Sequence, residues 1–498
     1  MSCDGPSAKG EEEMTGIDPD ELAACIRVLD RAAALDENHP DSVAVRRATA
    51  GLFKAVKKRR RLDSRARVAE ADRAVVAATA TGSPERIDDE TAGLALTSAT
   101  TSDSAGTLQR ARPCYICKQR YTVVDAFYHQ LCPACAALNH QKRDARTDLT
   151  GRRAVLTGGR AKIGMYIALR LLRDGAHLTI TTRFPADAVR RFSSMHDSHD
   201  WMHRLSVVGI DLRDPAQVVA FADAVAAEGP LDILINNAAQ TVKRSAGSYT
   251  ALEDGEHGVD LAALGVRTFG ATSDAHPAAL VGAFGETDGE SVALDTAVMA
   301  NMGPSQVTSM ALVAGSSSLQ RMAAGTAIDA GGLVPDEAPT NSWVHTVDQV
   351  DPVELLEVQL CNSVAPFILV SRLRSALAAS SYRRAYIVNV SAMEGQFGRG
   401  YKGPGHPHTN MAKAALNMLT RTSANEMMDD GISMSAVDTG WITDERPHPT
   451  KIRLADEGFH APLDLVDGAA RVYDPIVQGE LGLDLHGKFL KDYAASPW

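Results

Sequence analysis

The chain has 498 residues, and roughly 100–200 residues per domain predicts two to four domains. Hydrophobic residues make up 45% and charged residues 23% of it, a globular composition that excludes wholesale disorder. The 62 acidic residues outnumber the 51 basic ones, and the net charge of −11 argues against nucleic acid or anionic lipid as the main partner.

Targeting and redox signals are weak in this sequence. No window approaches the about 18 uninterrupted apolar residues that a membrane helix needs. The first residues, MSCDGPSAKGEEE, are acidic and lack the basic-then-apolar order of a signal peptide. The 7 cysteines are too few for a disulfide framework in a chain of this length. We therefore expect a cytoplasmic protein without a membrane segment.

Three segments are predicted before the main cysteine cluster. Residues 1–17 are acidic and small, which favours a mobile tail. Residues 18–77 are expected to form a helical hairpin, because apolar residues recur there at helical spacing and Pro19 lies just inside the start. Residues 78–111 are rich in Thr, Ser, Ala and Asp without a period, and are predicted to be a linker.

A basic run lies in the second half of the hairpin, where Asp63 is the single acid. Its members are Lys54, Lys57, Lys58, Arg59, Arg60, Arg61, Arg65 and Arg67. Such a run can be an anion or nucleic-acid patch or a nuclear signal. It can equally be a solvated helix face that pairs with the acidic tail. We favour the solvated face, because short basic runs are common and the whole chain is acidic.

A pair of CxxC motifs gives the strongest short signal. Cys114 and Cys117 are followed, after 14 intervening residues, by Cys132 and Cys135. Four thiolates at this spacing can surround one tetrahedral Zn²⁺, and the residues between them have β-hairpin composition. The sequence therefore predicts a zinc-ribbon-like module over residues 112–140. Its metal is expected to be structural, because four sulfurs leave no position open for a substrate.

From about residue 150 the pattern changes to alternating short strands and helices. The expected strands are 154–156, 178–181, 205–210, 231–235 and 386–391. Alternation of this kind predicts an α/β fold with a doubly wound parallel sheet of the Rossmann type.

The motifs along this region resemble those of the short-chain dehydrogenase/reductase family. The first turn reads TGGRAKIG where the family has TGxxxGxG, and NNAA at 236–239 resembles the family's NNAG. Asn362, YIVNVS at 386–391, TNMAK at 409–413 and VDTG at 437–440 follow in family order. The resemblance covers about 151–241 and 350–498, and implies an SDR-type domain over 150–498 with a long insertion at about 242–349.

Cofactor binding follows from the turn itself as well as from the resemblance. Gly158, Gly159 and Gly164 let a backbone approach a pyrophosphate at a helix N-terminus. Lys162 replaces the family's middle glycine, where it would either crowd the phosphates or pair with them. The cofactor-binding residues that we expect are Gly158, Arg160, Ile163, Gly164, Arg183, Asp211, Asn237, Ala238 and Lys413.

The second strand ends on Thr182 and Arg183, where an NAD site would place an acid. An arginine there, with Arg160 on the neighbouring turn, suits a 2′-phosphate through charge-assisted hydrogen bonds. NADP is therefore favoured over NAD.

The catalytic positions depart from the family pattern. The resemblance places the catalytic group at Asn362, Ser391, Thr409 and Lys413, with Ser391 one place before the family's usual position. Thr409 occupies the place of the tyrosine proton donor, and an aliphatic hydroxyl is too weak an acid to replace a phenol directly. Tyr401, His406 and His408 are nearby candidate donors, and each could equally be an ordinary loop residue. His408 adjoins Thr409 and has a suitable intrinsic pKa.

Two interpretations of the 242–349 insertion stay open, a substrate lid or oligomer contact and a lineage-specific loop. For the whole chain, the first hypothesis is an NADP-dependent oxidoreductase acting on a carbonyl or alcohol, with an altered proton donor. The alternative is a catalytically silent NADP(H)-binding sensor or scaffold. We expect a homo-oligomer, with the zinc module available to a protein partner.

Overall fold

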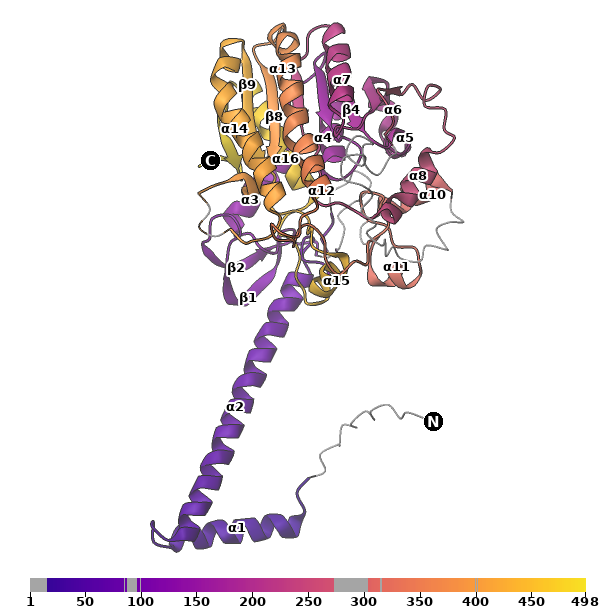
Figure 1. Cartoon of the computed structure of the whole chain (residues 1–498). Helices are drawn as coiled ribbons and strands as arrows, with labels where there is room; N and C mark the ends of the chain where they lie inside the picture. Colours follow the sequence, from indigo (N-terminus) through magenta and orange to yellow (C-terminus); the bar gives the residue numbers. More distant parts are fainter. Residues whose placement is uncertain are drawn as a thin grey trace, which may run out of the picture. The chain divides into compact units, whose positions relative to one another are not determined.

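A computed structural model describes residues 16–84, 86, 96–98, 100–272, 303–313, 316–398, 400 and 402–498. The chain divides into two units between Ala71 and Asp72. The first holds α1 (Pro19–Ala34) and most of α2 (Pro40–Ala77), and the second holds the sheet that carries the candidate site (Figure 1).

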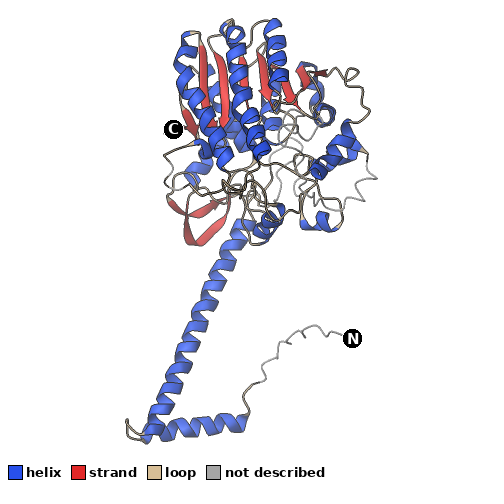
Figure 2. Cartoon of the chain, viewed as in Figure 1, coloured by secondary structure: helices blue, strands red, loops and turns tan. Residues whose placement is uncertain are grey.

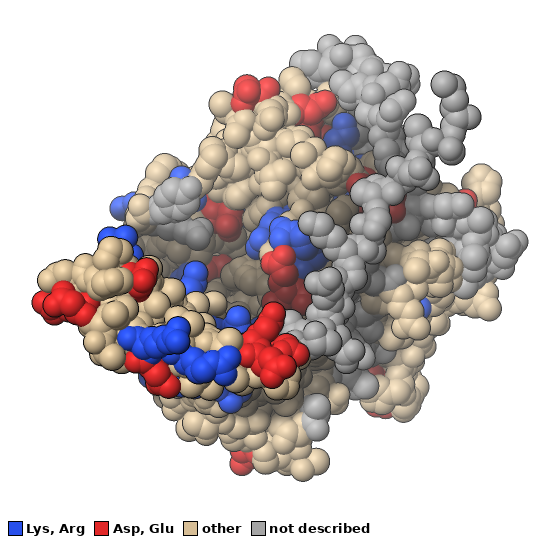
Figure 3. All heavy atoms as spheres, turned by 90° about the horizontal axis from the view of Figure 1, so that it is seen from below, with Lys and Arg blue, Asp and Glu red and all other residues tan. Residues whose placement is uncertain are grey.

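In the first unit, α1 begins where the sequence favours a helix start. The Asp18 carboxylate accepts hydrogen bonds from the backbone N–H groups of Asp20 and Glu21, which satisfies donors that a helix terminus leaves open. The basic run of α2 is exposed along its length. Figure 3 shows Lys and Arg side chains together with Asp and Glu side chains on the face that is seen from below. The acidic tail up to residue 15 lies outside the described residues, so its pairing with the run stays a prediction.

The cysteine region forms an antiparallel hairpin followed by a helix. Strand β1 (Ser104–Pro113) pairs with β2 (Arg120–Asp125), and α3 (Pro133–Arg143) follows. The predicted linker over 78–111 is therefore wrong in its last part, which is strand β1. Its polar composition concealed this strand, which is fixed by pairing with β2 and by the Asp72 carboxylate accepting from the Gln109 N–H at 2.6 Å.

A nine-stranded sheet forms the centre of the second unit, and it confirms the predicted doubly wound α/β fold. Its order is β11-β10-β9-β8-β6-β3-β4-β5-β7, parallel except for β11. The strands are β3 (Arg153–Thr157), β4 (His177–Thr182), β5 (Leu205–Gly209), β6 (Ile233–Asn236), β7 (Arg267–Thr268), β8 (Ala385–Ser391), β9 (Ile432–Asp438), β10 (Phe489–Lys491) and β11 (Ala494–Ser496). The strand order reverses between β3 and β6, which is where such sheets bind ligands.

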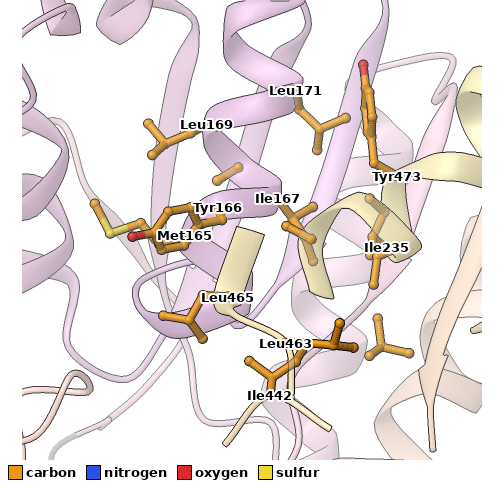
Figure 4. Close-up of a cluster of buried hydrophobic side chains, with 14 of the residues drawn as sticks. Met165, Tyr166, Ile167, Leu169, Leu171, Ile235, Ile442, Leu463, Leu465 and Tyr473 are labelled. Carbon is orange, nitrogen blue, oxygen red and sulfur yellow. The ribbon is translucent and has the colours of Figure 1, made fainter. Parts of the chain in front are cut away.

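Helices cover the sheet in two layers (Figures 1 and 2). One hydrophobic core joins α4 and α16 to the sheet, and the other joins α7 and α13 to it. The helices of this region are α4 (Lys162–Arg173), α5 (Pro185–Ser193), α6 (Ser198–Trp201), α7 (Pro215–Ala227), α12 (Pro352–Gln359), α13 (Ala365–Ala378), α14 (Pro407–Asp429), α15 (His448–Asp456) and α16 (Leu465–Glu480). Figure 4 shows α4 side chains beside Ile235 of β6 and Tyr473 of α16.

One helical stretch, Pro352–Ala378, is long and apolar enough to cross a membrane by length and composition alone. Half of it is buried inside the molecule, and its α13 part packs on α7. A core helix of a sheet-centred domain meets the same criteria.

The described parts of the insertion pack at the edge of the sheet that β5 and β7 form. Strand β7 extends the sheet beside β5, and α10 (Pro304–Ala311) packs on α5 and on α8 (Thr250–Glu256). A small core of Val307, Ala311 and Ile328 holds this region together. Helix α11 (Leu319–Ala323) follows.

Candidate functional site

A cavity of about 410 Å³ opens at the carboxyl ends of β3, β4, β5 and β6. Its lining includes the predicted residues Gly158, Arg160, Ile163, Gly164, Arg183, Asp211, Asn237 and Ala238. The fold thus brings together, at the point where strand order reverses, every predicted cofactor residue except Lys413.

Two glycines of the first turn have no room for a side chain. A Cβ on Gly158, whose φ is 69°, would lie 2.9 Å from the Ala238 Cα. A Cβ on Gly164 would lie 1.9 Å from the Gly158 carbonyl oxygen. Asn237 secures the turn from the next strand, because its side-chain amide donates to the Thr157 and Gly158 carbonyl oxygens at 3.1 Å each. The α4 N-terminus is therefore closely approachable by an anion.

Lys162 has an unusual backbone conformation for a residue with a side chain. Its φ is 53°, in the left-handed region, although it is not a glycine. Its Nζ lies 3.9 Å from the Asp329 carboxylate, which the insertion supplies.

The role of Arg160 as a phosphate partner stays a prediction, and the structure gives its guanidinium two partners within the protein. Its Nη1 is 2.5 Å from the Asp187 carboxylate, and its Nη2 donates to the Gly331 carbonyl oxygen at 2.7 Å. The guanidinium therefore joins α5 and the insertion to the first turn. Sequence alone did not reveal this role, because the partners come from distant segments.

Arg183 remains available for the role predicted for it. It follows β4 in the cavity wall, and its guanidinium lies 5.0 Å from the Tyr249 ring centroid and 5.3 Å from that of Phe184. No ion pair of Arg183 occurs within the described part of the chain. Stacking on two rings holds the cation in place while leaving its N–H donors for a ligand.

The Asp211 carboxylate forms an ion pair with the neighbouring Arg213. Its two carboxylate oxygens accept from Arg213 Nε at 3.0 Å and Nη2 at 2.7 Å, and Arg213 also reaches Glu357 at 2.8 Å. Asp211 therefore shapes the wall through this buried network.

Asn362 lies behind the cavity wall, where it binds the backbone of Gln240, a residue that lines the cavity. Asn362 lies in a π-helical turn (Leu360–Val364) between α12 and α13. Its Oδ1 accepts from the Gln240 N–H at 2.7 Å, and its Nδ2 donates to the Gln240 carbonyl at 2.8 Å. Ser391 is instead turned toward α14, where its hydroxyl donates to Asn417 Oδ1 at 2.6 Å. Because this bond uses the hydroxyl proton of Ser391, that proton is not available to a substrate oxygen.

Thr409 and Lys413 lie one turn apart on α14, and both are buried. Within the described residues, the Thr409 hydroxyl has no hydrogen-bond partner. Lys413 Nζ donates to the Val390 carbonyl oxygen at 2.9 Å, and burial lowers the pKa of Lys413 to about 8. Over the described residues, the cavity lining includes Cys361 and Gln240 but none of Asn362, Ser391, Thr409 and Lys413.

The histidine candidates for a replacement acid are weakened by their surroundings. Burial lowers the pKa of His408 to about 4, well below the intrinsic pKa that made this histidine a candidate donor. The His406 ring stacks on Trp343 at 4.0 Å between centroids, and its Nδ1 is 2.8 Å from the Trp343 carbonyl oxygen. Tyr401 lies outside the described residues.

The four cysteines meet in space as their spacing predicts. The sulfurs of Cys114, Cys117, Cys132 and Cys135 all lie within 4.8 Å of one another, and those of Cys117 and Cys132 are 3.6 Å apart. A tetrahedral site with Zn–S bonds of about 2.3 Å needs sulfur–sulfur distances of about 3.8 Å. The donor set thus fits a structural Zn²⁺, with all four positions filled by protein.

The cysteine module is fastened to the segment between β9 and α16. Arg143 of α3 is buried and donates to Asp464 at 2.5 and 3.0 Å, with Asp467 at 3.0 Å. The Tyr128 hydroxyl donates to Asp467 at 2.6 Å, and Arg86 donates to backbone carbonyls at 461 and 463. These contacts span more than 300 residues of sequence and join the cysteine region to the segment that precedes α16 and to the start of α16.

Sequence reasoning missed several residues of this site. Asn417 had a usable signal, because Thr409, Lys413 and Asn417 recur every fourth residue on one helix face. Arg244, Asp329 and Glu445 had none, since only tertiary folding brings them together beside the first turn.

Comparison with known proteins agrees with this geometry. Residues 152–266 match the family described as short chain dehydrogenase. The chain is 28% identical over 377 residues to an uncharacterised protein of Acanthamoeba polyphaga mimivirus, covering 73% of this chain and 71% of that one. It is 42% identical over 91 residues to a probable oxidoreductase of Streptomyces antibioticus, covering 18% of this chain and 30% of that protein.

Similar solved structures include the Pseudomonas aeruginosa RhlG/NADP active-site complex, at 17% identity and TM-score 0.40, covering 69% of this chain and 95% of that one. The NADPH-bound carbonyl reductase from chicken fatty liver is 18% identical with TM-score 0.39, covering 70% of this chain and all of that one, 100%. The match over 152–266 and the oxidoreductase relatives show that this part of the chain is similar to short-chain dehydrogenases, and the strand order is that of a doubly wound parallel sheet.

Proposed function

We propose that this protein is an NADP(H)-dependent oxidoreductase that interconverts a carbonyl and an alcohol, with an altered proton donor. The observation that carries the proposal is the cavity at the strand reversal, with Gly158 and Gly164 at its floor and Arg183 on its wall. The guanidinium of Arg183, stacked on Tyr249 after β4, supports NADP over NAD because an arginine at the end of this strand suits a 2′-phosphate.

When bound, NADP(H) supplies the chemistry of hydride transfer. The protein's own residues would bind and orient it: the first turn and the α4 N-terminus would hold the pyrophosphate, and Arg183 would hold the ribose phosphate. Asn362 holds the Gln240 backbone in the wall through two hydrogen bonds.

Lys413 is the group that we assign to proton transfer. With a pKa of about 8, Lys413 is still protonated near neutral pH, and its ammonium is more acidic than that of an ordinary lysine. A general acid works best when its pKa lies near the operating pH. Thr409 lies one turn away on α14, and its buried hydroxyl has no hydrogen-bond partner within the described residues.

A second candidate is a cofactor-binding protein without turnover. The Ser391–Asn417 hydrogen bond favours it, because this serine is not oriented toward a substrate. The two functions are separated by nicotinamide oxidation or reduction against a panel of carbonyls and alcohols, with Lys413→Ala as the control. Absence of turnover with intact NADPH binding would favour the silent protein.

NADPH is expected to bind more tightly than NADH, and Arg183→Ala to remove most of the difference. A lost charge-assisted contact is worth about 1.5–3 kcal/mol, or roughly ten- to over a hundredfold in affinity. Calorimetry on wild type and variant measures both affinities. Equal affinities for the two cofactors in wild type would show that the assignment of Arg183 is wrong.

The remaining predictions concern the setting of this function. A cytoplasmic location, a homo-oligomer and a protein partner at the zinc module stay proposals, resting on the acidic composition and on the family resemblance.

A further inference from the structure

One stretch of the cavity wall has no helix or strand of its own. Residues 441–445, the wall loop, follow β9 and supply Thr443 and Glu445 to the cavity lining. Outside a helix or strand, backbone groups depend on other segments for their hydrogen bonds. The insertion holds the far end of the loop, where the Asn341 side-chain amide donates to the Glu445 carbonyl oxygen at 2.9 Å. The near end is held from the cysteine region.

The near end of the wall loop is bonded to Tyr115, which lies between Cys114 and Cys117 in the first CxxC motif. The Tyr115 hydroxyl accepts a hydrogen bond from the Trp441 N–H at 3.0 Å. Tyr115 also packs against the main hydrophobic core, which fixes its ring on the domain. Trp441 precedes the cavity residue Thr443 by two positions. The first CxxC motif is therefore in direct contact with the backbone that leads into the cavity wall.

The position of Tyr115 depends in turn on the closed cysteine module. Its N–H donates to the Gln130 carbonyl oxygen at 2.8 Å, which ties the first motif to the segment just before the second. The Cys132 N–H donates to the Cys114 sulfur at 3.3 Å. A Zn²⁺ on the four sulfurs would join both motifs through one ion. Opening the module would therefore release the Tyr115 hydroxyl from the wall loop.

We propose that Tyr115 is a positioning residue that couples metal binding at the cysteine cluster to dinucleotide binding in the cavity, by holding the wall loop. The proposal rests on the proposed function and concerns the regulation of its site. With the metal bound, the loop is fixed in the cavity wall. Without the metal, the near end of the loop loses its bond and the wall is less ordered. Such coupling is reciprocal, so a bound dinucleotide must raise the zinc affinity by the same factor.

Zinc-loaded Tyr115→Phe should bind NADPH roughly two- to tenfold more weakly than zinc-loaded wild type, the effect of one neutral hydrogen bond. Chelation should weaken wild type by at least as much. The factor by which NADPH raises zinc affinity should fall in the variant by the same two- to tenfold, roughly. Phenylalanine keeps the ring and all four sulfurs, so this variant should retain its zinc. Calorimetry on the full chain measures NADPH affinity, and competition with a chelator of known strength measures zinc affinity with and without NADPH.

Tyr121→Phe is the matched control, because it removes the same hydroxyl from the same module. The Tyr121 hydroxyl donates to the His129 carbonyl oxygen at 2.7 Å, inside the module and away from the wall loop. This variant should lose zinc affinity, while the factor by which NADPH raises that affinity stays as in wild type. Hydrogen exchange over 441–445 should accelerate in zinc-loaded Tyr115→Phe and hold in zinc-loaded Tyr121→Phe. Thermal unfolding checks that both variants are folded.

The outcomes separate the coupling from the proposed function. Equal NADPH affinity in zinc-loaded Tyr115→Phe and wild type, with an unchanged coupling factor, would overturn the role of Tyr115 and leave the oxidoreductase standing. The same holds if chelation leaves the NADPH affinity of wild type unchanged. An equal fall of the coupling factor in Tyr121→Phe would assign the effect to module stability, which also overturns the role. If zinc-loaded wild type binds neither NADPH nor NADH, the proposed function fails and the coupling fails with it.

Discussion

Replacing Cys135 with serine is expected to empty the metal site and unfold residues 112–140. Freshly purified wild type should carry about one Zn²⁺ per chain, because its four sulfurs lie within bonding range of one ion. Metal binding is folding free energy for such modules, about 10–16 kcal/mol in isolated zinc-finger peptides at neutral pH. Metal analysis and thermal unfolding of wild type, Cys114→Ser and Cys135→Ser measure the effect.

The same loss should reach the cofactor domain. Arg143 and Tyr128 connect the module to Asp464 and Asp467, which would stay buried but lose these partners. Breaking a buried pair from one side costs about 3–5 kcal/mol. Hydrogen exchange over residues 441–467 should therefore accelerate on chelation, before the parallel sheet opens.

Cys25→Ser is the control for this experiment. Cys25 is exposed on α1 and belongs to no cysteine cluster among the described residues. Its variant should keep both zinc and stability. A zinc content well below one ion per chain in freshly purified wild type would contradict the prediction of a structural metal site.

Removing the amine of Lys413 is expected to lower turnover by about 10²–10⁴-fold, the contribution of a positioned general acid. Burial lowers the pKa of Lys413 to about 8, so the ammonium predominates below this pH. Carbonyl reduction consumes a proton and should therefore decline as pH rises through about 8. Alcohol oxidation needs the neutral amine and should rise over the same range. The measurements are kcat and KM of wild type and Lys413→Met between pH 6 and 10.

Two further variants test the assignment. His408→Gln should change turnover little, because burial lowers the pKa of His408 to about 4 and leaves it neutral. Thr409→Tyr would restore the family's phenol beside Lys413 and should raise turnover, unless its added volume disturbs α14 at this buried position. A wild-type rate that survives Lys413→Met would contradict the assignment, and the unplaced Tyr401 would then be the next residue to substitute.

The sequence was sufficient wherever local chemistry repeats a known geometry. Glycine spacing predicted the first turn, because Gly158 and Gly164 face backbone atoms that exclude any Cβ. Alternating apolar strands predicted the parallel sheet, since strands buried on both faces must be apolar. CxxC spacing predicted the sulfur cluster, because two short loops suffice to aim four thiolates at one point.

Tertiary structure decided everything that depends on distant partners. The sequence suggested the same role for Arg160 and Arg183. In the structure Arg160 pairs with Asp187, whereas Arg183 lies over aromatic rings. The predicted linker became strand β1 because β2 supplied its hydrogen bonds. The pKa of His408 is lowered by burial, and the residues adjacent to His408 in the sequence do not determine how deeply it is buried. Charge, burial and pairing are set by which segments meet in space, and those contacts are not encoded in any local window of the sequence.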